Sequence, residues 1–242
     1  MNSLSTEDPL AVTAVEAIHT GDVQALVDLL AEHPVLATVR LGDCDMSRTL
    51  LHVATDWPGH FPHGPETVAA LVSAGADVNA RFHGGHTETP LHWAASSNDV
   101  AVLDALLDAG ADIDAPGAVI GGGTPLADAR AFGQWSAAHR LVERGAHTTL
   151  VDAATLGLQD RLELFFTTST PSQADLNHAF WGACHGGQHT CAEYLLDHGA
   201  EVNWIPPWED LTPLDAASRS DATTLVTWLR DQGGLSAPEL PA

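Results

Sequence analysis

With 242 residues and 45% hydrophobic content, the chain is long enough to bury a sizeable core in one or two domains, and no apolar run approaches the roughly 18 residues of a membrane-spanning helix. Nine basic residues face 32 acidic ones, and the net charge of −23 repels nucleic acids and anionic lipids while favouring a cationic partner. All the basic residues are arginine, which excludes a phosphate-loop lysine and a Schiff-base lysine.

The cysteines and the N-terminus predict a location. Cys44, Cys184 and Cys191 form neither a disulfide framework nor a CxxC pair, which is typical of a reducing compartment. The first residues lack the basic and apolar regions of a secretory signal peptide. We therefore expect a cytoplasmic protein, and the arginine-only basicity with abundant alanine indicates a GC-rich bacterial genome.

The first predicted element, residues 8–45, is a helical segment that starts with polar residues and suits an N-terminal cap. From residue 46 onward, a signature introduces most of the helix pairs: TLLHVAT at Thr49, TPLHWAA at Thr89, TPLADAR at Thr124 and TPLDAAS at Thr212. Threonine predicts the N-cap of the first helix. Proline is tolerated at the first helical position because its missing N–H would have no partner there.

A second motif ends the helix pairs. It reads ALVSAGADVNA at 70–80, ALLDAGADIDA at 105–115, RLVERGAHTTL at 140–150 and YLLDHGAEVNW at 194–204. Its first three glycines, Gly75, Gly110 and Gly145, are 35 residues apart and predict helix C-caps, because glycine adopts the left-handed conformation cheaply. Such helix pairs are too amphipathic to stand alone and must stack on their neighbours.

Both motifs, in this order and at this spacing, resemble the ankyrin repeat family. The resemblance implies an all-α fold, an ankyrin-type solenoid of about seven helix-turn-helix units with projecting loops. The units are expected at 8–45, 46–83, 84–119, 120–148, 149–171, 172–208 and 209–235. The last one suits a C-terminal cap, so we expect a single ankyrin repeat domain over 1–236, followed by a short tail at 237–242.

The resemblance also implies a concave face, built from first helices and loop tips, that in the family usually binds other proteins. Each unit exposes two groove positions after the Ala-Ala pair, and a further exposed position precedes the Thr-Pro pair. The groove positions include Asp56, Trp57 and His185, and the further position corresponds to Arg48 and Glu88.

The stretch TDWPGHFPHGPETV at 55–68 inserts extra residues directly after two of those groove positions. Its three prolines restrict the backbone and predict a stiff loop that displays Trp57, His60, Phe61 and His63. We expect this insert to form a rigid wall of the recognition face. The alternative is that Trp57 and Phe61 pack under the adjacent unit.

Long finger loops join the units. The finger at 81–88 carries His83 and His86, the finger at 115–123 is rich in glycine, and the finger at 203–210 carries Trp204 and Trp208. Exposed tryptophans on a stiff loop are typical of binding anchors. The alternative is that these two tryptophans cap the end of the core.

The high histidine count raises the question of a metal. His60 with His63, and His83 with His86, have the spacing H-x-x-H. The two pairs are expected at opposite ends of the helices, one at a turn and one at a finger, and no cysteine completes either set. We therefore predict no metal site and no cofactor.

The signature histidines His52 and His92 are expected to be structural and to bond to the backbone of adjoining loops. Asp128 and Asp152 are predicted to occupy a first-helix position that is normally apolar. A buried carboxylate needs a partner, and an unpaired one would have a raised pKa and could transfer protons. The candidate partners are Arg130 and Arg140.

The sequence therefore predicts a non-enzymatic protein- or peptide-binding module that uses its concave face and its finger loops. The partner is expected to be a protein or peptide with a basic surface. The residues predicted to bind it are Arg48, Asp56, Trp57, His60, Phe61, His63, His83, His86, Glu88, His185, Trp204 and Trp208.

Two alternatives stay open. A groove closed by the 56–65 insert and the 81–88 and 115–123 fingers could bind a small molecule or perform His/Asp acid–base chemistry as an isomerase, lyase or hydrolase, although no catalytic residue is assigned. An acidic decoy for nucleic-acid-binding proteins would instead array carboxylates on one surface. Binding to nucleic acid or to a membrane is not expected.

Overall fold

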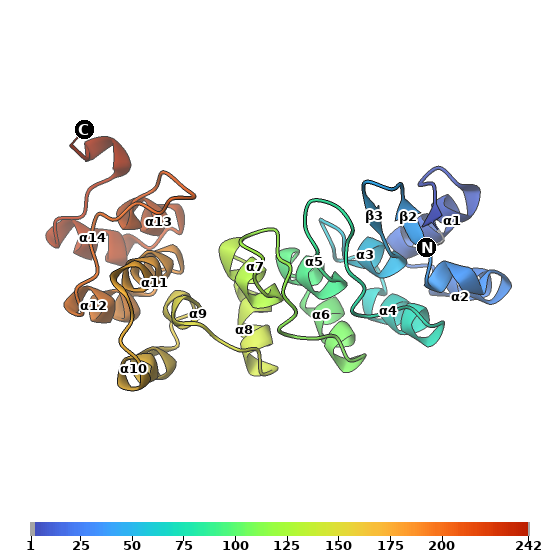
Figure 1. The fold of residues 1–242 in the computed structure, drawn as a ribbon, viewed down its shortest axis with the longest axis horizontal. Coiled ribbons are helices and arrows are strands. Elements are labelled where there is room, and N and C mark those ends of the chain that lie inside the picture. Colours follow the sequence, from blue (N-terminus) through green and yellow to red (C-terminus); the bar gives the residue numbers. More distant parts are fainter. Residues whose placement is uncertain (1–2, 242) are drawn as a thin grey trace. The chain divides into compact units, whose positions relative to one another are not determined.

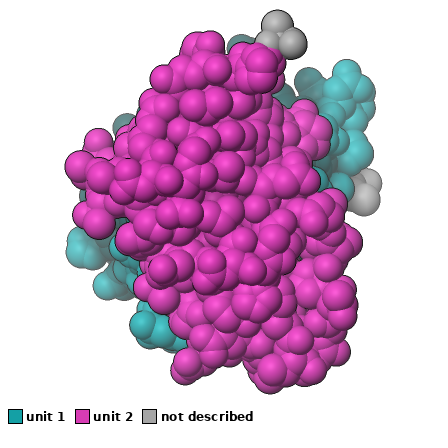
Figure 2. Space-filling model, turned by 90° about the vertical axis from the view of Figure 1, so that its left-hand side faces the viewer, with its two compact units in different colours: residues 1–146 teal, residues 147–242 magenta. Residues whose placement is uncertain are grey.

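The structure is a computed structural model that describes residues 3–241. It divides into two compact units, one ending at Ala146 and the other beginning at His147, which Figure 2 colours separately. Residues 1, 2 and 242, which belong to the predicted domain and its tail, lie outside the described residues. The single domain over 1–236 stays a prediction.

Unit 1 contains four helix pairs that stack in two layers (Figure 1). The first helices, which contact one another in order, are α1 (Pro9–Thr20), α3 (Leu50–Thr55), α5 (Pro90–Ser96) and α7 (Pro125–Ala131). The second helices, which form the other layer, are α2 (Val23–Glu32), α4 (Gly64–Ser73), α6 (Val100–Asp108) and α8 (Trp135–Glu143). A short 3-10 helix, η1 (Pro34–Ala37), follows α2.

Unit 2 repeats the same arrangement with three helix pairs. The pairs are α9 (Leu150–Thr155) with α10 (Gln159–Thr168), α11 (Gln173–His185) with α12 (His189–Asp197), and α13 (Pro213–Arg219) with α14 (Thr223–Asp231). A 3-10 helix, η2 (Ala237–Glu239), follows them. Across residues 3–241, the seven pairs fall in the seven predicted repeat units, so the all-α prediction is confirmed.

Three very short strands tie the first loops together. Strand β1 (Ser3–Leu4) pairs in parallel with β2 (Arg40–Gly42), which pairs antiparallel with β3 (Ser47–Arg48). An isolated bridge then joins Ser47 to His83 of the next finger. The strands contain two or three residues each, so they fix the loops without adding a sheet layer to the helical core.

Leucines and alanines fill the space between the helix layers. Leu71, Leu103 and Leu141 of the second helices have no exposed surface, and neither do Ala94 and Ala95 of α5. Small side chains on the first helices allow neighbouring pairs to approach closely, as the signature predicts. At the C-terminal ends of the pairs, the motif glycines have left-handed φ values between 92° and 100°, which confirms the predicted caps.

Hydrogen bonds from the two signature histidines link the second repeat to the third and the third repeat to the fourth. Nδ1 of His92 accepts the backbone N–H of Thr89 at 3.1 Å, and its Nε2–H donates to the carbonyl of Gly123 at 3.3 Å, directly before Thr124. His52 bonds in the same way to the carbonyl of Glu88 at 3.2 Å. The predicted structural role of both histidines is confirmed.

In three repeats another hydrogen-bonding residue fills the histidine position: Trp181, Asp152 and Asp215, the last of which accepts the backbone N–H of Thr212 at 3.1 Å. The indole N–H of Trp181 donates to the carbonyl of Leu211 at 2.9 Å, directly before Thr212, and so replaces the imidazole bond. Asp152 also sits at the histidine position, where its carboxylate accepts the backbone N–H of Thr149 at 2.9 Å and the hydroxyl at 2.6 Å. The prediction that Asp152 matches Asp128 is therefore wrong by one residue in register.

Acidification should destabilise the protein through the signature histidines. Burial lowers the pKa of His52 to about 3 and that of His92 to about 4, so below about pH 6.5 only the unfolded chain takes up their protons. Each histidine then removes up to about 1.4 kcal/mol of unfolding free energy per pH unit. Urea denaturation at several pH values should show that His92→Gln is less stable than the wild type. Its free energy of unfolding should also fall less steeply as the pH is lowered. His139→Gln, on an exposed position of α8, should keep the wild-type slope; an equal slope in His92→Gln would contradict the assignment.

Within residues 3–241, no helix combines the length and the apolar character needed to cross a bilayer.

Candidate functional site

The insert between α3 and α4 runs along the helix-hairpin turns. The backbone N–H of His60 donates to Asp99 at 2.7 Å, and its Nε2–H donates to the carbonyl of Ser97 at 3.1 Å, both at the turn between α5 and α6. On the other side, the ring of Phe61 stacks on His19 at the end of α1, with ring centroids 4.5 Å apart. The insert therefore joins the turns of three successive units.

Trp57 and Phe61 of the insert have different surroundings. The side chain of Phe61 is half-buried against His19, as the packing alternative expects. Trp57, in contrast, is 80% exposed and packs under no neighbour. Among the insert residues, Trp57 is thus the large apolar side chain that is free to bury surface against a partner.

An ion pair connects the finger end of α3 to the insert. Arg48 of β3 bonds to Asp56, the C-cap of α3, and each side chain is about one-third exposed. The charge of Arg48 is already neutralised by Asp56. Arg48 would therefore contribute to partner binding through hydrogen bonds more than through its charge.

Two neighbouring cavities form a groove on the first-helix side of unit 1. One has a volume of about 460 Å³ and lies against α1; the other, of about 690 Å³, reaches from the 41–48 loop to α5. They share Thr6, Leu41 and Arg48, so they meet in one continuous groove. The further lining residues, several of them apolar, include Val12, Val15, Glu16, His19, Asp43, Met46, Phe82, His86 and Trp93.

An aromatic cluster forms the wall of the groove at α5. The ring of Phe82 stacks on His86 at 4.4 Å and lies 5.6 Å from Trp93, whose other neighbour, His52, packs edge-on at 5.0 Å. Trp93 is half-buried and lines the groove, although the sequence places it at a position normally filled by core residues. The sequence signal that could have found it is its place on the first helix, directly after the inward-bonded His92.

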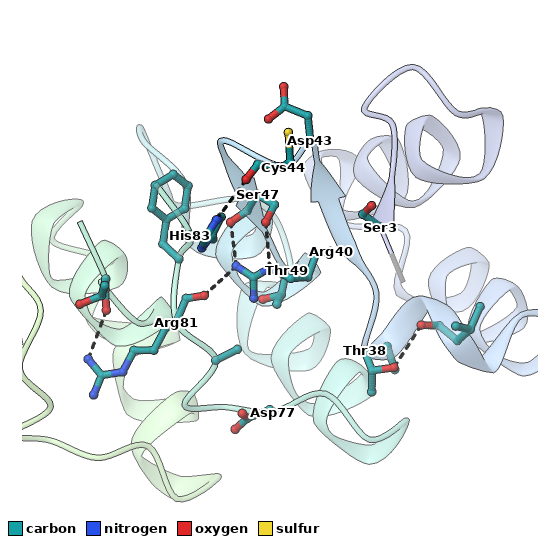
Figure 3. Close-up of a pocket in the computed structure, with 15 residues that line it drawn as sticks. Ser3, Thr38, Arg40, Asp43, Cys44, Ser47, Thr49, Asp77, Arg81 and His83 are labelled. Atoms are coloured by element: carbon teal, nitrogen blue, oxygen red, sulfur yellow. Dashed lines mark hydrogen bonds between the residues drawn. The ribbon is translucent and has the colours of Figure 1, made fainter. Parts of the chain in front are cut away.

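A third cavity, of about 930 Å³, is lined mainly by the 40–49 segment and the 81–88 finger (Figure 3). At its centre, Arg40 donates to the hydroxyl of Ser47 at 2.9 Å and to the carbonyls of Ser47 and Arg81 at 2.7 Å. His83 donates to the carbonyl of Cys44 at 3.1 Å. These bonds hold the 40–48 loop against the 81–88 finger, so His83 faces this cavity and not the groove.

Glu88 is the most constrained of the predicted binding residues. One carboxylate oxygen accepts the backbone N–H of Val119 at 2.7 Å, and the other lies 3.2 Å from Nδ1 of His86. The residue is only 5% exposed, so the expected exposure of this position is wrong for Glu88. The Glu88 carboxylate bonds to the 115–123 finger, and this contact buries it.

Asp128 of α7 lies beside Glu88 with no exposed surface. Neither carboxyl oxygen of Asp128 accepts a hydrogen bond from a donor within residues 3–241. Burial, and then the neighbouring charge of Glu88, raise the pKa of Asp128 to about 8, while Arg130 opposes the shift. Protonated Asp128 carries an O–H donor that faces the neighbouring carboxylate of Glu88 as its acceptor.

The expected arginine partner of Asp128 is only partly found. Arg140 pairs with Asp104 at 2.9 Å and with Glu143 at 2.9 Å, so it is engaged elsewhere. Arg130 acts on Asp128 through its charge. The sequence could not identify Glu88 as the neighbour, because the two carboxylates belong to different repeats and are 40 positions apart in the chain.

Unit 2 places its three predicted residues in one aromatic cluster. Trp208 is 53% exposed and lies 4.6 Å from the ring of His178 and 5.9 Å from Trp204. His185 is only 8% exposed and packs 5.4 Å from Trp181, so its expected exposure at a groove position is wrong. The bulk of the tryptophan at the signature histidine position covers it.

The twelve predicted residues therefore gather at three places. In unit 1, Trp57, His60, Phe61 and His63 belong to the insert at the turns, and Arg48, His83, His86 and Glu88 belong to the loops at the other end of the helices, with Asp56 linked to them by Arg48. The remaining three belong to unit 2. No group of three or more His, Cys, Asp or Glu residues suited to a metal ion occurs in the described part of the chain.

Comparisons with known proteins give consistent matches. Residues 63–152 match the family model for ankyrin repeats, in three copies. A stretch of 46 residues is 54% identical to palmitoyltransferase AKR1 of Kluyveromyces lactis; it covers 19% of this chain and only 6% of the length of that protein. The chain is also similar to the crystal structure of the human ASB11 ankyrin repeat domain, with 26% identity, coverage of 81% of this chain and 92% of that one, and a TM-score of 0.44.

Replacing Asp128 should stabilise the protein, and increasingly so as the pH rises. In the unfolded chain an aspartate ionises near pH 4, whereas in the fold Asp128 keeps its proton to about pH 8. Between those values the wild type loses up to about 1.4 kcal/mol of unfolding free energy per pH unit relative to Asp128→Asn. Chemical denaturation of both proteins at about pH 6 and about pH 8 measures the difference. Asp197→Asn, at an exposed position of α12, should match the wild type at both values; a pH-independent difference for Asp128→Asn would contradict the prediction.

Proposed function

Because this chain is an ankyrin repeat protein, we propose that it is a protein- or peptide-binding module that captures its partner on the first-helix face of unit 1. Ankyrin repeats are generally protein-interaction modules, and repeat stacks offer extended surfaces for this purpose. The observation that carries the proposal is the continuous groove between α1, the 41–48 loop and α5.

The shape of the groove favours a polypeptide ligand over a small molecule. The two cavities meet end to end along Thr6, Leu41 and Arg48, which suits an extended segment. A pocket for acid–base chemistry would need the insert and the 115–123 finger to close over it. None of the three cavities described above is lined by a residue of either segment.

The apolar and charged lining residues define the ligand that the groove would accept. Met46 is 61% exposed and Trp93 is half-buried, so an apolar side chain of the partner could bury surface against both. Glu16 and Asp43 add negative charge at the lining, in keeping with the strongly acidic chain. We therefore propose a partner segment that combines apolar residues with basic ones.

The insert extends the proposed contact towards the turns. A partner that lies across Arg48 reaches Asp56, the other half of the ion pair, and then the exposed ring of Trp57. Large aromatic side chains that become buried at an interface carry a disproportionate share of binding energy.

The cysteines are free thiols, which supports a cytoplasmic setting for this interaction.

Photo-crosslinking tests the site even before the partner has been identified. A photoreactive amino acid at position 46, in the groove, should crosslink a defined protein in cells of the source organism. The same amino acid at position 164 of α10 is the control, because Leu164 is 60% exposed and Met46 is 61% exposed. Equal crosslinking patterns at the two positions would refute the groove as the binding site.

Trp57→Ala should weaken binding of that partner without affecting folding. Loss of an aromatic anchor costs about 2 kcal/mol, or roughly 30-fold in dissociation constant. The unfolding transition should be unchanged because the side chain is 80% exposed. Titration calorimetry with the purified partner measures the affinity, and Leu164→Ala serves as the matched control. An unchanged affinity for Trp57→Ala would remove the insert from the binding site.

A further inference from the structure

We propose that the Glu88–Asp128 carboxyl pair is a pH-dependent lock on the 115–123 finger, closed while Asp128 is protonated and released when Asp128 ionises. The pair joins three segments of unit 1: the 81–88 finger, α7 and the 115–123 finger. The repeats that start at Thr49, Thr89, Thr149 and Thr212 place Val53, Trp93, Ala153 and Ala216 at the position of Asp128.

The tip of the 115–123 finger is held by Glu88. Its base is fixed separately, by the bond from the N–H of Thr87 to the carbonyl of Gly117 at 3.2 Å and by Arg81, which donates to Pro116. At the tip, the bond to another segment is the one from the N–H of Val119 to Glu88 at 2.7 Å. Breaking that bond would free the tip while the base stays in place.

The tip itself is built to move once it is released. Val119 and Ile120 are 55% and 45% exposed, so little packing holds their side chains. Gly121 and Gly122 follow, both in the left-handed region, and a Cβ on either would meet nothing within 4 Å. The turn at Val119 and Ile120 therefore has open space around it, while the N–H groups of Gly117 and Ala118 donate to Gly122 and Gly123, both at 3.0 Å, and hold the two sides of the finger together.

The charges around Asp128 leave Glu88 as the group that must respond to its ionisation. From its own helix, Arg130 favours the charged form, and from the 81–88 finger Glu88 opposes it. His86 lies beside Glu88, and His92 of α5 is kept neutral by burial and is bonded to Gly123. From α8, the side chains of His139 and Glu143 are exposed, and Arg140 is paired with Asp104.

Ionisation of Asp128 brings two carboxylates together in a space closed to water. Because burial and Glu88 hold the pKa of Asp128 near 8, the second charge appears between about pH 7 and about pH 9. Two like charges at this depth repel strongly, and hydrating one of them relieves the repulsion. Asp128 is enclosed in α7, whereas Glu88 stands on a loop and keeps slight exposure, so Glu88 is the one to move and the Val119 bond breaks.

The lock affects the binding of a partner only where that partner reaches beyond the groove to the 115–123 finger, because no residue of this finger lines the groove. If the finger contributes Val119 and Ile120 to the partner contact, the affinity falls as the pH rises through the titration of Asp128; this consequence rests on the proposed function. The lock itself does not, because it is a property of the free protein.

Methyl NMR of the free, full chain tests the lock, with valine and isoleucine methyl groups and aspartate carboxyl carbons labelled with ¹³C. Between about pH 6 and about pH 9.5, the methyl signals of Val119 and Ile120 should shift together with a midpoint near that of the Asp128 carboxyl carbon. In Asp128→Asn the side-chain amide donates to Glu88 at every pH, so the methyl shift should disappear and the finger should stay locked. Methyl groups do not exchange with water, so the alkaline range remains observable.

A control variant and the separate carboxyl-carbon readout keep the test decisive. Glu66→Gln, at an exposed position of α4, should keep the wild-type methyl titration. Methyl shifts that persist in Asp128→Asn, or an Asp128 carboxyl carbon that titrates near the ordinary aspartate value, would overturn the proposal, and the second readout needs no variant at all. Failure to crosslink a partner at position 46 would instead count against the proposed function and leave the lock untouched.

Discussion

The bond from a first helix to the backbone just before the next threonine is the interaction on which the rest of this structure depends. His52, His92 and Trp181 each make it, to Glu88, Gly123 and Leu211 respectively. The bond sets the distance between successive helix pairs and, at the same time, fixes where each finger leaves the core. Because it joins only neighbours, each unit can carry irregular segments at its ends without disturbing its helices.

The candidate site of unit 1 follows from that freedom. The insert lies on the turns, the fingers lie at the opposite ends of the helices, and the Arg48–Asp56 ion pair spans α3 between them. The groove lies on the first-helix side, where Trp93 and the Phe82–His86 stack provide apolar surface beside polar side chains. The proposed recognition surface and the packing surface are thus separate faces of the same short helices.

The helix pairs could be predicted from the sequence because their causes are local. A threonine such as Thr89 begins a helix and a glycine such as Gly110 ends one, so these repeated signals locate most of the seven helix pairs in the described chain. The candidate site was harder to predict from the sequence, since its geometry depends on loops from different repeats. Nothing in the residues around Asp128 indicates that Glu88 lies against it, whereas the place of Trp93 directly after His92 was the one local signal for a groove wall.

The insert also changes how the N-terminal end of the stack can come apart. Linear arrays of repeats normally unravel from their termini, one module after another, because each end module is held on one side only. Here the insert of the second repeat contacts both His19 of the first repeat and Asp99 of the third. Peeling off the first module therefore has to disturb the second, so these three modules should open as a single cooperative block.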